Sequence, residues 1–249
     1  MTAAAVKTPL AALLTRIPRG RLGQALRLRL ITWSRRAPLP LAIARGDTVV
    51  QVGAVGDGEL WRMLELVGRT GRVVVVEPFP DHVETIEARL RAEGIANVTV
   101  IGKGAWSGPG TQALHVHPQW SDSNIVLESG ARHDRALAPE EYPYAVEIEV
   151  DSLDDLLASH GIEHCDFIKI TVMGAELQVL AGMNRVLADR PTLWVKAHSE
   201  IDGRPANATI AALLHERGFR TVIVRGNRGP GGVRRPGDVY AMPAAGAGS

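Results

Sequence analysis

Short runs of β-branched and apolar residues recur along the chain, each followed by glycine or proline and then by apolar residues at helical spacing. Continuous apolar runs are typical of buried strands, whereas apolar residues three and four apart are typical of helices. The pattern predicts core strands at residues 48–52, 73–77, 97–101, 167–172 and 192–198, and helices at about 60–67, 80–93, 153–157, 175–180 and 207–217. Strands that alternate with helices predict an α/β fold with a parallel sheet.

Other segments depart from this alternation. Residues 9–33 predict two short helices, interrupted near Pro18 and Gly20, and residues 111–116 and 146–150 predict a hairpin or an extension of the sheet. The stretch 118–145 is polar and proline-punctuated, and its aromatic residues suit a lid over a substrate pocket, with a disordered insertion as the alternative. We therefore divide the chain into an N-terminal arm (1–45), a main domain (46–243, with the candidate lid at 118–145) and a disordered tail (244–249).

Composition is that of a globular protein with a sizeable core. Of 249 residues, 45% are hydrophobic and 22% charged, which fits one α/β domain with additions. The single cysteine, Cys165, excludes an intramolecular disulfide and mildly favours a reducing compartment. No apolar run approaches membrane-spanning length, and the N-terminus lacks the pattern of a signal peptide. These features predict a cytoplasmic protein.

Charge is distributed unevenly along the chain. Nine basic residues and no acid precede Asp47, whereas the remainder carries 19 basic and 27 acidic side chains, a net charge of −8. The arginine-bearing helices of the arm predict a layer packed on the main domain. The alternative is a surface that binds anionic lipid, a polyanion or an acidic partner.

A glycine-rich turn follows the first core strand, with glycines at positions 53, 56 and 58. Glycine allows positive φ and close approach of a ligand to the backbone, and amides at the start of a helix bind polar groups of nucleotides. A plain strand–helix connection would explain the turn alone. However, the second strand ends at Glu77, about 20 residues later, where βαβ nucleotide-binding folds place the acid that binds ribose hydroxyls. Turn and acid together predict a nucleoside cofactor.

Several stretches of the region from about residue 46 to 225 resemble the FkbM family of S-adenosylmethionine-dependent methyltransferases, in the family's order. They are Val52-Gly53-Ala54, Val76-Glu77-Pro78-Phe79-Pro80, Asn97-Val98, Ser152-Leu153-Asp154-Asp155, Asp166-Phe167-Ile168-Lys169-Ile170, Gly174-Ala175-Glu176, Val179-Leu180-Ala181-Gly182 and His198. The resemblance implies a class I methyltransferase (Rossmann-like) fold, a doubly wound sheet of seven strands with helices on both faces. The last two predicted strands, 221–225 and 238–242, resemble its antiparallel closing pair.

The resemblance also implies S-adenosylmethionine as cofactor and O-methylation of a small hydroxylated molecule such as a sugar or polyketide. The candidate cofactor-binding residues are Gln51, Gly53, Ala54, Gly56, Gly58, Glu77, Pro78, Lys103, Ala105 and Thr171. His198 is the candidate base, because imidazole titrates near physiological pH; a hydrogen-bonded residue at a strand end is the alternative. No metal site is expected.

Four acids of the family pattern are missing. The family's acidic positions at the ends of the first, fourth and fifth strands are occupied by Gln51, Thr171, Met173 and Lys196. In the turn, Val55 replaces the family's asparagine and Asp57 falls at its glycine. Because carboxyl ends of parallel strands meet at one edge, we expect a neutral or positive pocket there. Lys196, the second candidate catalytic residue, would be a solvated charge or an anchor for a substrate carboxylate or phosphate.

The leading hypothesis is a methyltransferase acting on a small-molecule hydroxyl. The alternative from another class is a catalytically lapsed methyltransferase-like protein that serves as a binding or regulatory partner. Nucleic acid is not expected as a partner, because the main domain is acidic and no Asn-Pro-Pro-Tyr-like motif is present. The acceptor and the oligomeric state stay undetermined.

The basic arm generates the first testable prediction. If residues 9–36 form a packed layer, their deletion lowers the thermal unfolding midpoint, and neither form binds liposomes. Salt-sensitive binding of the full-length protein to anionic vesicles, lost on deletion, would instead favour a membrane-surface role. Vesicle co-sedimentation at two salt concentrations, with zwitterionic vesicles as control, measures both outcomes.

Overall fold

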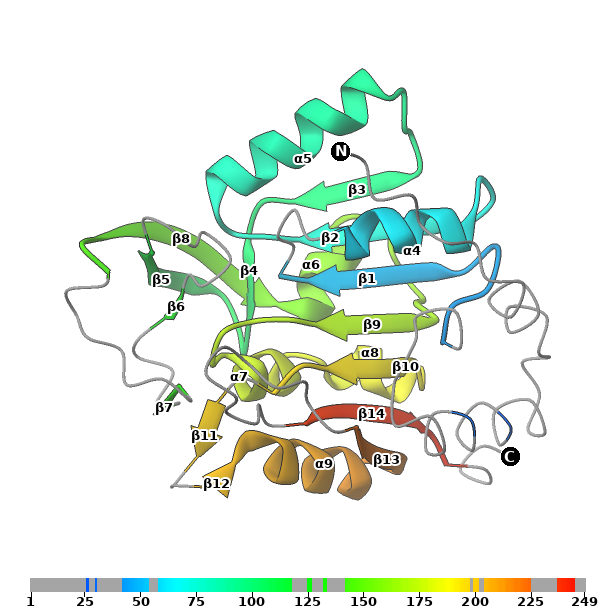
Figure 1. Ribbon diagram of the computed structural model, residues 1–249, viewed down its shortest axis with the longest axis vertical. Helices are drawn as coiled ribbons and strands as arrows, with labels where there is room; N and C mark the ends of the chain where they lie inside the picture. The colour runs from blue at the N-terminus through cyan, green and yellow to red at the C-terminus, as the bar shows by residue number, and fades with distance from the viewer. Residues whose placement is uncertain are drawn as a thin grey trace.

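A seven-stranded sheet forms the centre of the molecule (Figure 1). The computed structural model describes residues 26, 30, 42–53, 58–117, 125–126, 132–133, 142–197, 199–201, 204–224 and 237–244. The strand order is β13-β14-β10-β9-β1-β2-β3, and β14 alone is antiparallel to its neighbours on both sides. The strands are β1 (Thr48–Val52), β2 (Arg72–Val76), β3 (Val98–Ile101), β9 (Phe167–Ile170), β10 (Thr192–Val195), β13 (Phe219–Val224) and β14 (Asp238–Pro243). This confirms the predicted doubly wound class I methyltransferase sheet.

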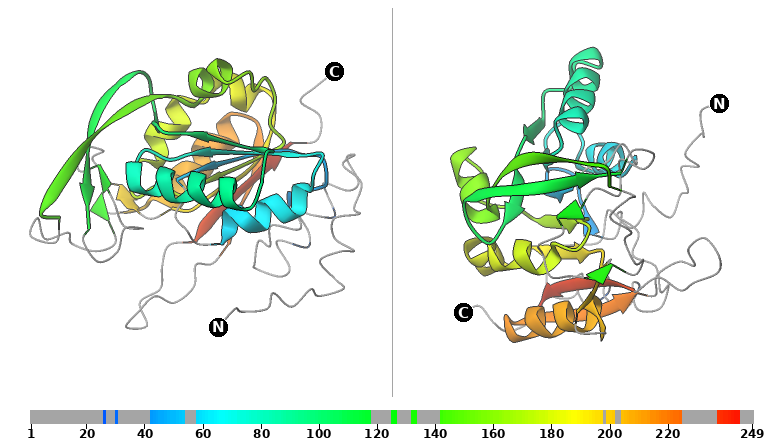
Figure 2. Two further views of the ribbon diagram at one scale, coloured as in Figure 1. Left: turned by 90° about the horizontal axis from the view of Figure 1, so that it is seen from above. Right: turned by 90° about the vertical axis from the view of Figure 1, so that its left-hand side faces the viewer.

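Helices cover both faces of this sheet (Figure 2). One face carries α4 (Glu59–Val67) and α5 (Pro80–Ala92); the other carries α6 (Leu153–Ser159), α7 (Glu176–Ala181), α8 (Asn184–Ala188) and α9 (Ala206–Glu216). Alternate strand residues supply the two cores: Val49, Val73 and Val75 face α4 and α5, whereas Val50, Val52 and Val74 face the other helices. Since both faces are buried, the central strands are continuously apolar, which is why the sequence pattern located them.

Local sequence signals set the starts and ends of the first two helices. Gly58 precedes α4 with φ 75°, and Gly68 follows it with φ 66°, conformations that glycine adopts without strain. Pro80 occupies the first turn of α5, where its missing N–H costs no hydrogen bond. Asp81 in that first turn and Arg89 and Arg91 in the last turn complement the helix dipole.

Two adjacent aspartates hold the start of α6, and one of them connects it to α8. The Ser152 hydroxyl accepts a hydrogen bond from the Asp155 amide at 3.0 Å, which caps α6 as predicted. The Asp154 carboxylate accepts hydrogen bonds from the amides of Arg185 and Val186, at 2.7 and 2.9 Å, at the start of α8. Gly182, between α7 and α8, packs so closely that a Cβ would lie 2.0 Å from the Trp106 carbonyl oxygen. These contacts give the Ser152–Asp155 and Gly182 positions a structural role.

A second, four-stranded sheet, β4-β8-β5-β6, extends from one end of the main sheet (Figures 1 and 2). It consists of β4 (Gly104–Trp106), β5 (Gly110–Val116), β6 (Ile125–Val126) and β8 (Tyr144–Ser152), and β5 pairs antiparallel with β8 as the predicted extension. A small core forms beneath it, centred on Phe79, Leu114, Val116, Ile148 and Val150. A three-stranded sheet joins β7 (Arg132–His133), β11 (Ser199–Ile201) and β12 (Arg204–Pro205).

Some predicted boundaries were wrong. Strand β9 ends at Ile170 instead of 172, and β10 ends at Val195 instead of 198. In each case one further amide, of Thr171 or Lys196, still bonds to the neighbouring strand before the chain leaves the sheet. The region 118–145, predicted without secondary structure, contains β6 and β7, and its remaining residues lie almost entirely outside the described part.

The predicted arm and tail fall on residues that are mostly not described. Of the arm, Leu26 and Leu30 are helical, and Leu30 packs against the core beneath α4 and α5. Most of the arm and residues 245–249 lie outside the described residues, so these domain boundaries stay predictions. Among the helices of the described segments, none has the length and apolar character needed to span a bilayer.

Candidate functional site

Four of the central strands end in one row. Val52 pairs with both Val76 and Ile170, and Ile170 also pairs with Val195, so the residues that follow these positions meet at the carboxyl edge of the sheet. Those residues are Gly53, Glu77, Thr171 and Lys196, all of which the sequence singled out. Strands β1, β2 and β3 extend the sheet to one side, whereas β9 and β10 extend it to the other, so the strand order switches direction between β1 and β9. Doubly wound sheets bind ligands at such a switch point.

Gly53 allows the close backbone contact at the centre of this edge. Its φ is 76°, its amide donates to the Val76 carbonyl oxygen at 2.9 Å, and a Cβ built on it would lie 2.0 Å from the carbonyl oxygen of Thr171. No side chain fits between these two segments. The sequence attributed Gly53 to ligand approach; the structure adds that glycine is needed for packing of β1 against the segment after β9.

A cavity opens at the carboxyl edge, between the main sheet and the four-stranded sheet. Its lining is largely apolar and comprises Val52, Gly53, Val76, Glu77, Pro78, His82, Gly104, Ala105, Trp106, Leu114, Ile148, Val150, Thr171, Val172, Met173 and Ala175. Five candidate cofactor-binding residues are therefore brought together here: Gly53, Glu77, Pro78, Ala105 and Thr171. Ala54, Gly56 and the candidate base His198 lie outside the described residues.

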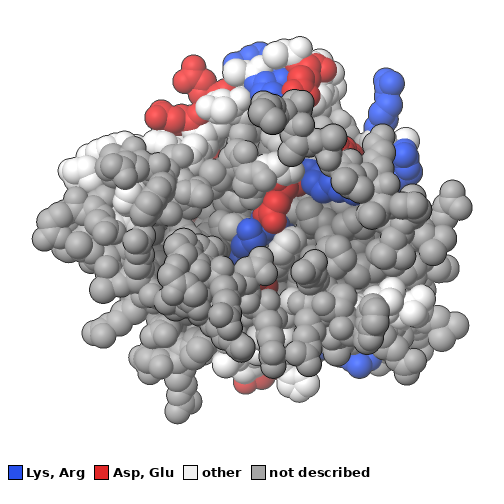
Figure 3. Space-filling model, in the orientation of Figure 1, with Lys and Arg blue, Asp and Glu red and all other residues white. Residues whose placement is uncertain are grey.

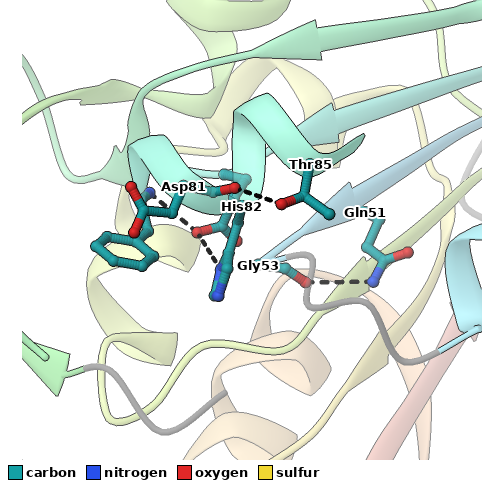
Figure 4. Close-up of polar contacts among 7 residues, drawn as sticks. Gln51, Gly53, Asp81, His82 and Thr85 are labelled. Carbon is teal, nitrogen blue, oxygen red and sulfur yellow. Dashed lines mark hydrogen bonds and ion pairs between the residues drawn. The ribbon is translucent and has the colours of Figure 1, made fainter. Parts of the chain in front are cut away.

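Glu77 is the buried acid of this cavity, with a residue exposure of 5%. Its Oε1 accepts a hydrogen bond from the Phe79 amide at 3.0 Å and lies 3.4 Å from Nδ1 of His82 (Figure 4). The backbone after β2 and the first turn of α5 thus fix the carboxylate at the cavity wall. Burial of an acid is unfavourable unless hydrogen bonds compensate, and both contacts do so.

The residues present suit a nucleoside cofactor. The apolar walls beside Ala105 and Val150 offer packing surface for a flat base, and Glu77 offers a carboxylate to hydroxyl groups. The hydroxyl oxygen of Thr171 is buried and has no hydrogen-bond partner within the described segments, although it belongs to a residue that lines the cavity. A buried polar atom of this kind gains from a ligand that bonds to it.

Two other candidates support the turn without lining the cavity. Gln51 is fully buried, and its Nε2 donates to the Gly53 carbonyl oxygen at 3.3 Å (Figure 4). Gly58 begins α4 with positive φ, and no atom lies within 4 Å of a Cβ built there. The structure therefore places both residues at the ends of the glycine-rich turn, and a direct cofactor contact by either stays a prediction.

Lys103 lies outside the cavity lining. Its Nζ forms an ion pair with Glu149 Oε2 at 2.6 Å on β8, and both side chains are largely exposed. The hydrogen bond and the opposite charge of the partner raise the pKa of Lys103 and lower the pKa of Glu149. From this segment Gly104, Ala105 and Trp106 line the cavity instead, and a contact of Lys103 with the cofactor stays a prediction.

One carboxylate, Glu59 in the first turn of α4, pairs with two lysines. Lys169 is completely buried on β9 and its Nζ forms an ion pair with Glu59 Oε2; Nζ of Lys196 lies 3.2 Å from the same oxygen. Both ammonium groups also face the ring of Trp194, with Nζ 5.3 and 5.7 Å from its centroid. An ammonium in the protein interior requires such a counter-charge.

This arrangement adds a paired acid to an edge that was predicted to be neutral or positive, and the role of Lys196 there stays a prediction. Glu59 binds Lys196, whose side chain is 25% exposed. A second acid, Asp238 on β14, accepts a hydrogen bond from Trp194 Nε1 at 2.9 Å. Glu59 thus supplies from α4 a negative charge of the kind that the family pattern places on the strands. Sequence reasoning missed it, although an acid directly after a glycine turn was a signal.

His82 was also missed. It occupies the first turn of α5, five residues after Glu77, and its side chain contacts that acid while lining the cavity. A histidine in the first turn of a helix gives no sequence signal by itself. The Pro-Phe-Pro segment that precedes it, by fixing where α5 begins, was the only indication that this position faces back toward Glu77.

The sequence of the chain matches those of known methyltransferases. A family model described as "Methyltransferase FkbM domain" matches residues 51–221, which is more than half of the chain. A protein-L-isoaspartate O-methyltransferase of Ignicoccus hospitalis is 40% identical over 68 residues, which cover 27% of this chain and 32% of that protein. The chain thus matches about a third of this curated relative.

Solved structures share the fold. A methyltransferase FkbM from Methylobacillus flagellatus matches with a TM-score of 0.54 and 15% identity, over 94% of this chain and 58% of that one. A fibrillarin from Aeropyrum pernix, solved with natively bound S-adenosyl-L-methionine, matches with a TM-score of 0.49 and 15% identity, over 86% of this chain and 74% of that one. The first match supports the fold assignment, and the chain spans little more than half of that protein.

The Glu59 bridge predicts unequal effects of its members on stability. Glu59→Gln removes the negative charge that Glu59 places against the buried Lys169 and should lower the free energy of unfolding by about 3–5 kcal/mol. Lys196→Gln removes a partly exposed partner and should cost no more than about 1 kcal/mol. Urea denaturation followed by circular dichroism measures both. Equal losses in the two variants would contradict the assignment of Glu59 to Lys169.

Proposed function

Because the chain belongs to the FkbM family of S-adenosylmethionine-dependent methyltransferases, we propose that it methylates a hydroxyl group of a small molecule, such as a sugar, a polyketide or a similar natural product. The observation that carries the proposal is the cavity at the carboxyl edge, where an apolar wall faces one buried acid. An enclosed surface of this kind suits a small ligand better than an extended polymer.

The charges around the cavity also favour a small molecule over a nucleic acid. On β8, Ile148 and Val150 face the cavity, while Glu147 and Glu149 face solvent, so the exposed surface of its wall carries acids. Over α5, acidic and basic side chains are interspersed, including the Arg89–Glu93 and Arg91–Glu87 pairs (Figure 3). Nucleic-acid binding requires clustered basic side chains that neutralise phosphates.

In this proposal the cavity residues bind and orient the cofactor. Glu77 accepts hydrogen bonds from the ribose, the Gly53 turn permits close backbone approach, and Gly104 and Ala105 pack against the base. S-adenosylmethionine, when bound, would supply a sulfonium methyl group: the acceptor oxygen would bond to the methyl carbon as the sulfur–methyl bond breaks, and S-adenosylhomocysteine would leave. The apolar side chains of Trp106, Ile148 and Met173 exclude water from this space.

The acceptor hydroxyl must also lose a proton. His198 is the proposed base, since it follows the end of β10 by three residues in the sequence and Lys196 by two. Lys196 forms an ion pair with Glu59. In the proposal its role is therefore electrostatic, and it does not accept the proton. An ammonium group at this edge suits attraction of an anionic group on the acceptor.

A catalytically lapsed protein is the competing possibility, and the missing acids motivate it. Restoring them by Gln51→Asp, Thr171→Asp and Met173→Glu would then create methyl transfer where the natural protein has none. Lys196→Glu should be added separately, because it would place a second carboxylate against Glu59. Loss of an existing activity on restoration would instead show that the natural edge is adapted to its acceptor.

Cofactor binding provides the first test. Glu77→Ala should weaken S-adenosylmethionine binding by about 2–3 kcal/mol, as expected for loss of a charged hydrogen-bond partner. Isothermal titration calorimetry measures the affinity. Glu149→Ala is the matched control, because it removes an exposed acid outside the cavity and should leave binding unchanged. A natural protein that binds no cofactor at millimolar concentration would be incompatible with the enzyme assignment.

Turnover provides the second test. His198→Ala should lower the rate of methyl transfer by about 10²–10⁴-fold, the usual contribution of a general base, with unchanged cofactor affinity. His160→Ala, a histidine on the C-terminal side of α6, is the control and should retain activity. The rate should also be insensitive to EDTA. Unaltered turnover in His198→Ala, or loss of turnover on chelation, would contradict the proposed chemistry.

A further inference from the structure

His82 is a second polar side chain in the wall of the cavity. Its ring leaves the first turn of α5 on the side of Gly53 (Figure 4) and packs edge-on against Phe79, with ring centroids 4.9 Å apart. Only 13% of the side chain is exposed. The ring is therefore held in one orientation by packing, with Glu77 at one nitrogen and the cavity beside it.

The contact with Glu77 determines the chemistry of both ring nitrogens. An ionised carboxylate only accepts hydrogen bonds, so Nδ1, 3.4 Å from Glu77 Oε1, must carry the hydrogen. In the neutral ring Nε2 is then a hydrogen-bond acceptor. Nε2 is buried, and no donor within the described residues bonds to it. A buried acceptor on a side chain that lines a cavity is suited to a ligand donor.

A ribose presents two adjacent hydroxyl donors, whereas the Glu77 carboxylate already accepts hydrogen bonds within the protein. Its Oε1 already accepts the Phe79 amide and faces Nδ1 of His82. We propose that Nε2 of His82 accepts the hydrogen bond of one ribose hydroxyl of the cofactor while Glu77 accepts that of the other. The two side chains form one unit, in which the Nδ1–H bond to the carboxylate orients the ring and leaves its second nitrogen directed to the ligand.

This inference rests on the assignment of the cavity to the cofactor and adds a residue that selects the intact ribose diol. Its test combines deletion of a ligand hydroxyl with a change of the residue. S-adenosylhomocysteine and its 2′-deoxy and 3′-deoxy analogues are titrated by calorimetry into the natural protein and into His82→Asn. The Asn amide nitrogen can reproduce the Nδ1 donor to Glu77 but offers no acceptor at the position of Nε2.

In the natural protein, each deoxy analogue should bind about tenfold more weakly than the parent ligand, the effect of one hydrogen bond. In His82→Asn, one of the two deletions should cost less than about threefold, which identifies the hydroxyl that His82 binds, while the other keeps its full effect. His82→Gln, which restores an acceptor near the position of Nε2, should recover discrimination against that same analogue. The ring ¹⁵N shifts of His82 should move on binding the parent ligand and not on binding that analogue.

His164→Asn is the matched control. His164 also contacts a carboxylate, with Nε2 3.5 Å from Asp166 Oδ1, but at the opposite edge of the sheet and with 61% of its side chain exposed. It should keep the natural discrimination between all three ligands. The inference would be overturned if each deoxy analogue lost as much affinity in His82→Asn as it does in the natural protein. A Gln variant that fails to recover discrimination would also overturn it. Absence of binding of the parent ligand to the natural protein would instead refute the cofactor assignment itself.

Discussion

The buried ammonium of Lys169 imposes the constraint on which the site depends. Lys169 lies in the central strand β9, where it pairs with Gln51 on β1 and with Trp194 on β10. It is completely buried there, so water cannot solvate its charge. Glu59 supplies the compensating carboxylate from the first turn of α4. Since Gly53 is fixed against the Thr171 backbone, both ends of the glycine-rich turn are tied to β9. The edge of the cavity is thus set by one ion pair and one backbone contact.

The charge pattern of this edge shows how a family motif can change while its electrostatics are partly retained. Gln51 in β1, Thr171 and Met173 after β9, and Lys196 after β10 occupy the positions that are acidic in the family pattern. An acid from a helix, Glu59, binds both Lys169 and Lys196. Attraction between charges depends on distance and local dielectric, and not on which element carries the carboxylate. The acids and lysines described at this edge are therefore largely paired with one another, and one ammonium, that of Lys196, is partly exposed at its margin.

Much of the fold could be predicted from the sequence because its signals are local. The β-branched runs before Gly53 and Glu77, the Ser152 cap and the glycine after Val67 each depend on neighbouring residues. The site was predicted in part, because register brings strand ends together without further information. The roles of Glu59 and His82 could not be predicted in this way. Each depends on the direction of a side chain toward a partner, and for Glu59 the partner on β9 is more than a hundred residues distant.

The pairing of β1 with β9 forms the central seam of the main sheet, and it affects the order in which the molecule assembles. β1 pairs with β9 although the chain between them is long, and the Thr48 amide bonds to the Asp166 carboxylate across a separation of 118 residues. Closing so long a loop is entropically costly and slow, so the first three strands can form well before the seam. The cavity has one wall on each side of it and exists only once both halves have docked. A ligand bound there contacts both halves at once and therefore stabilises the joined state by mass action.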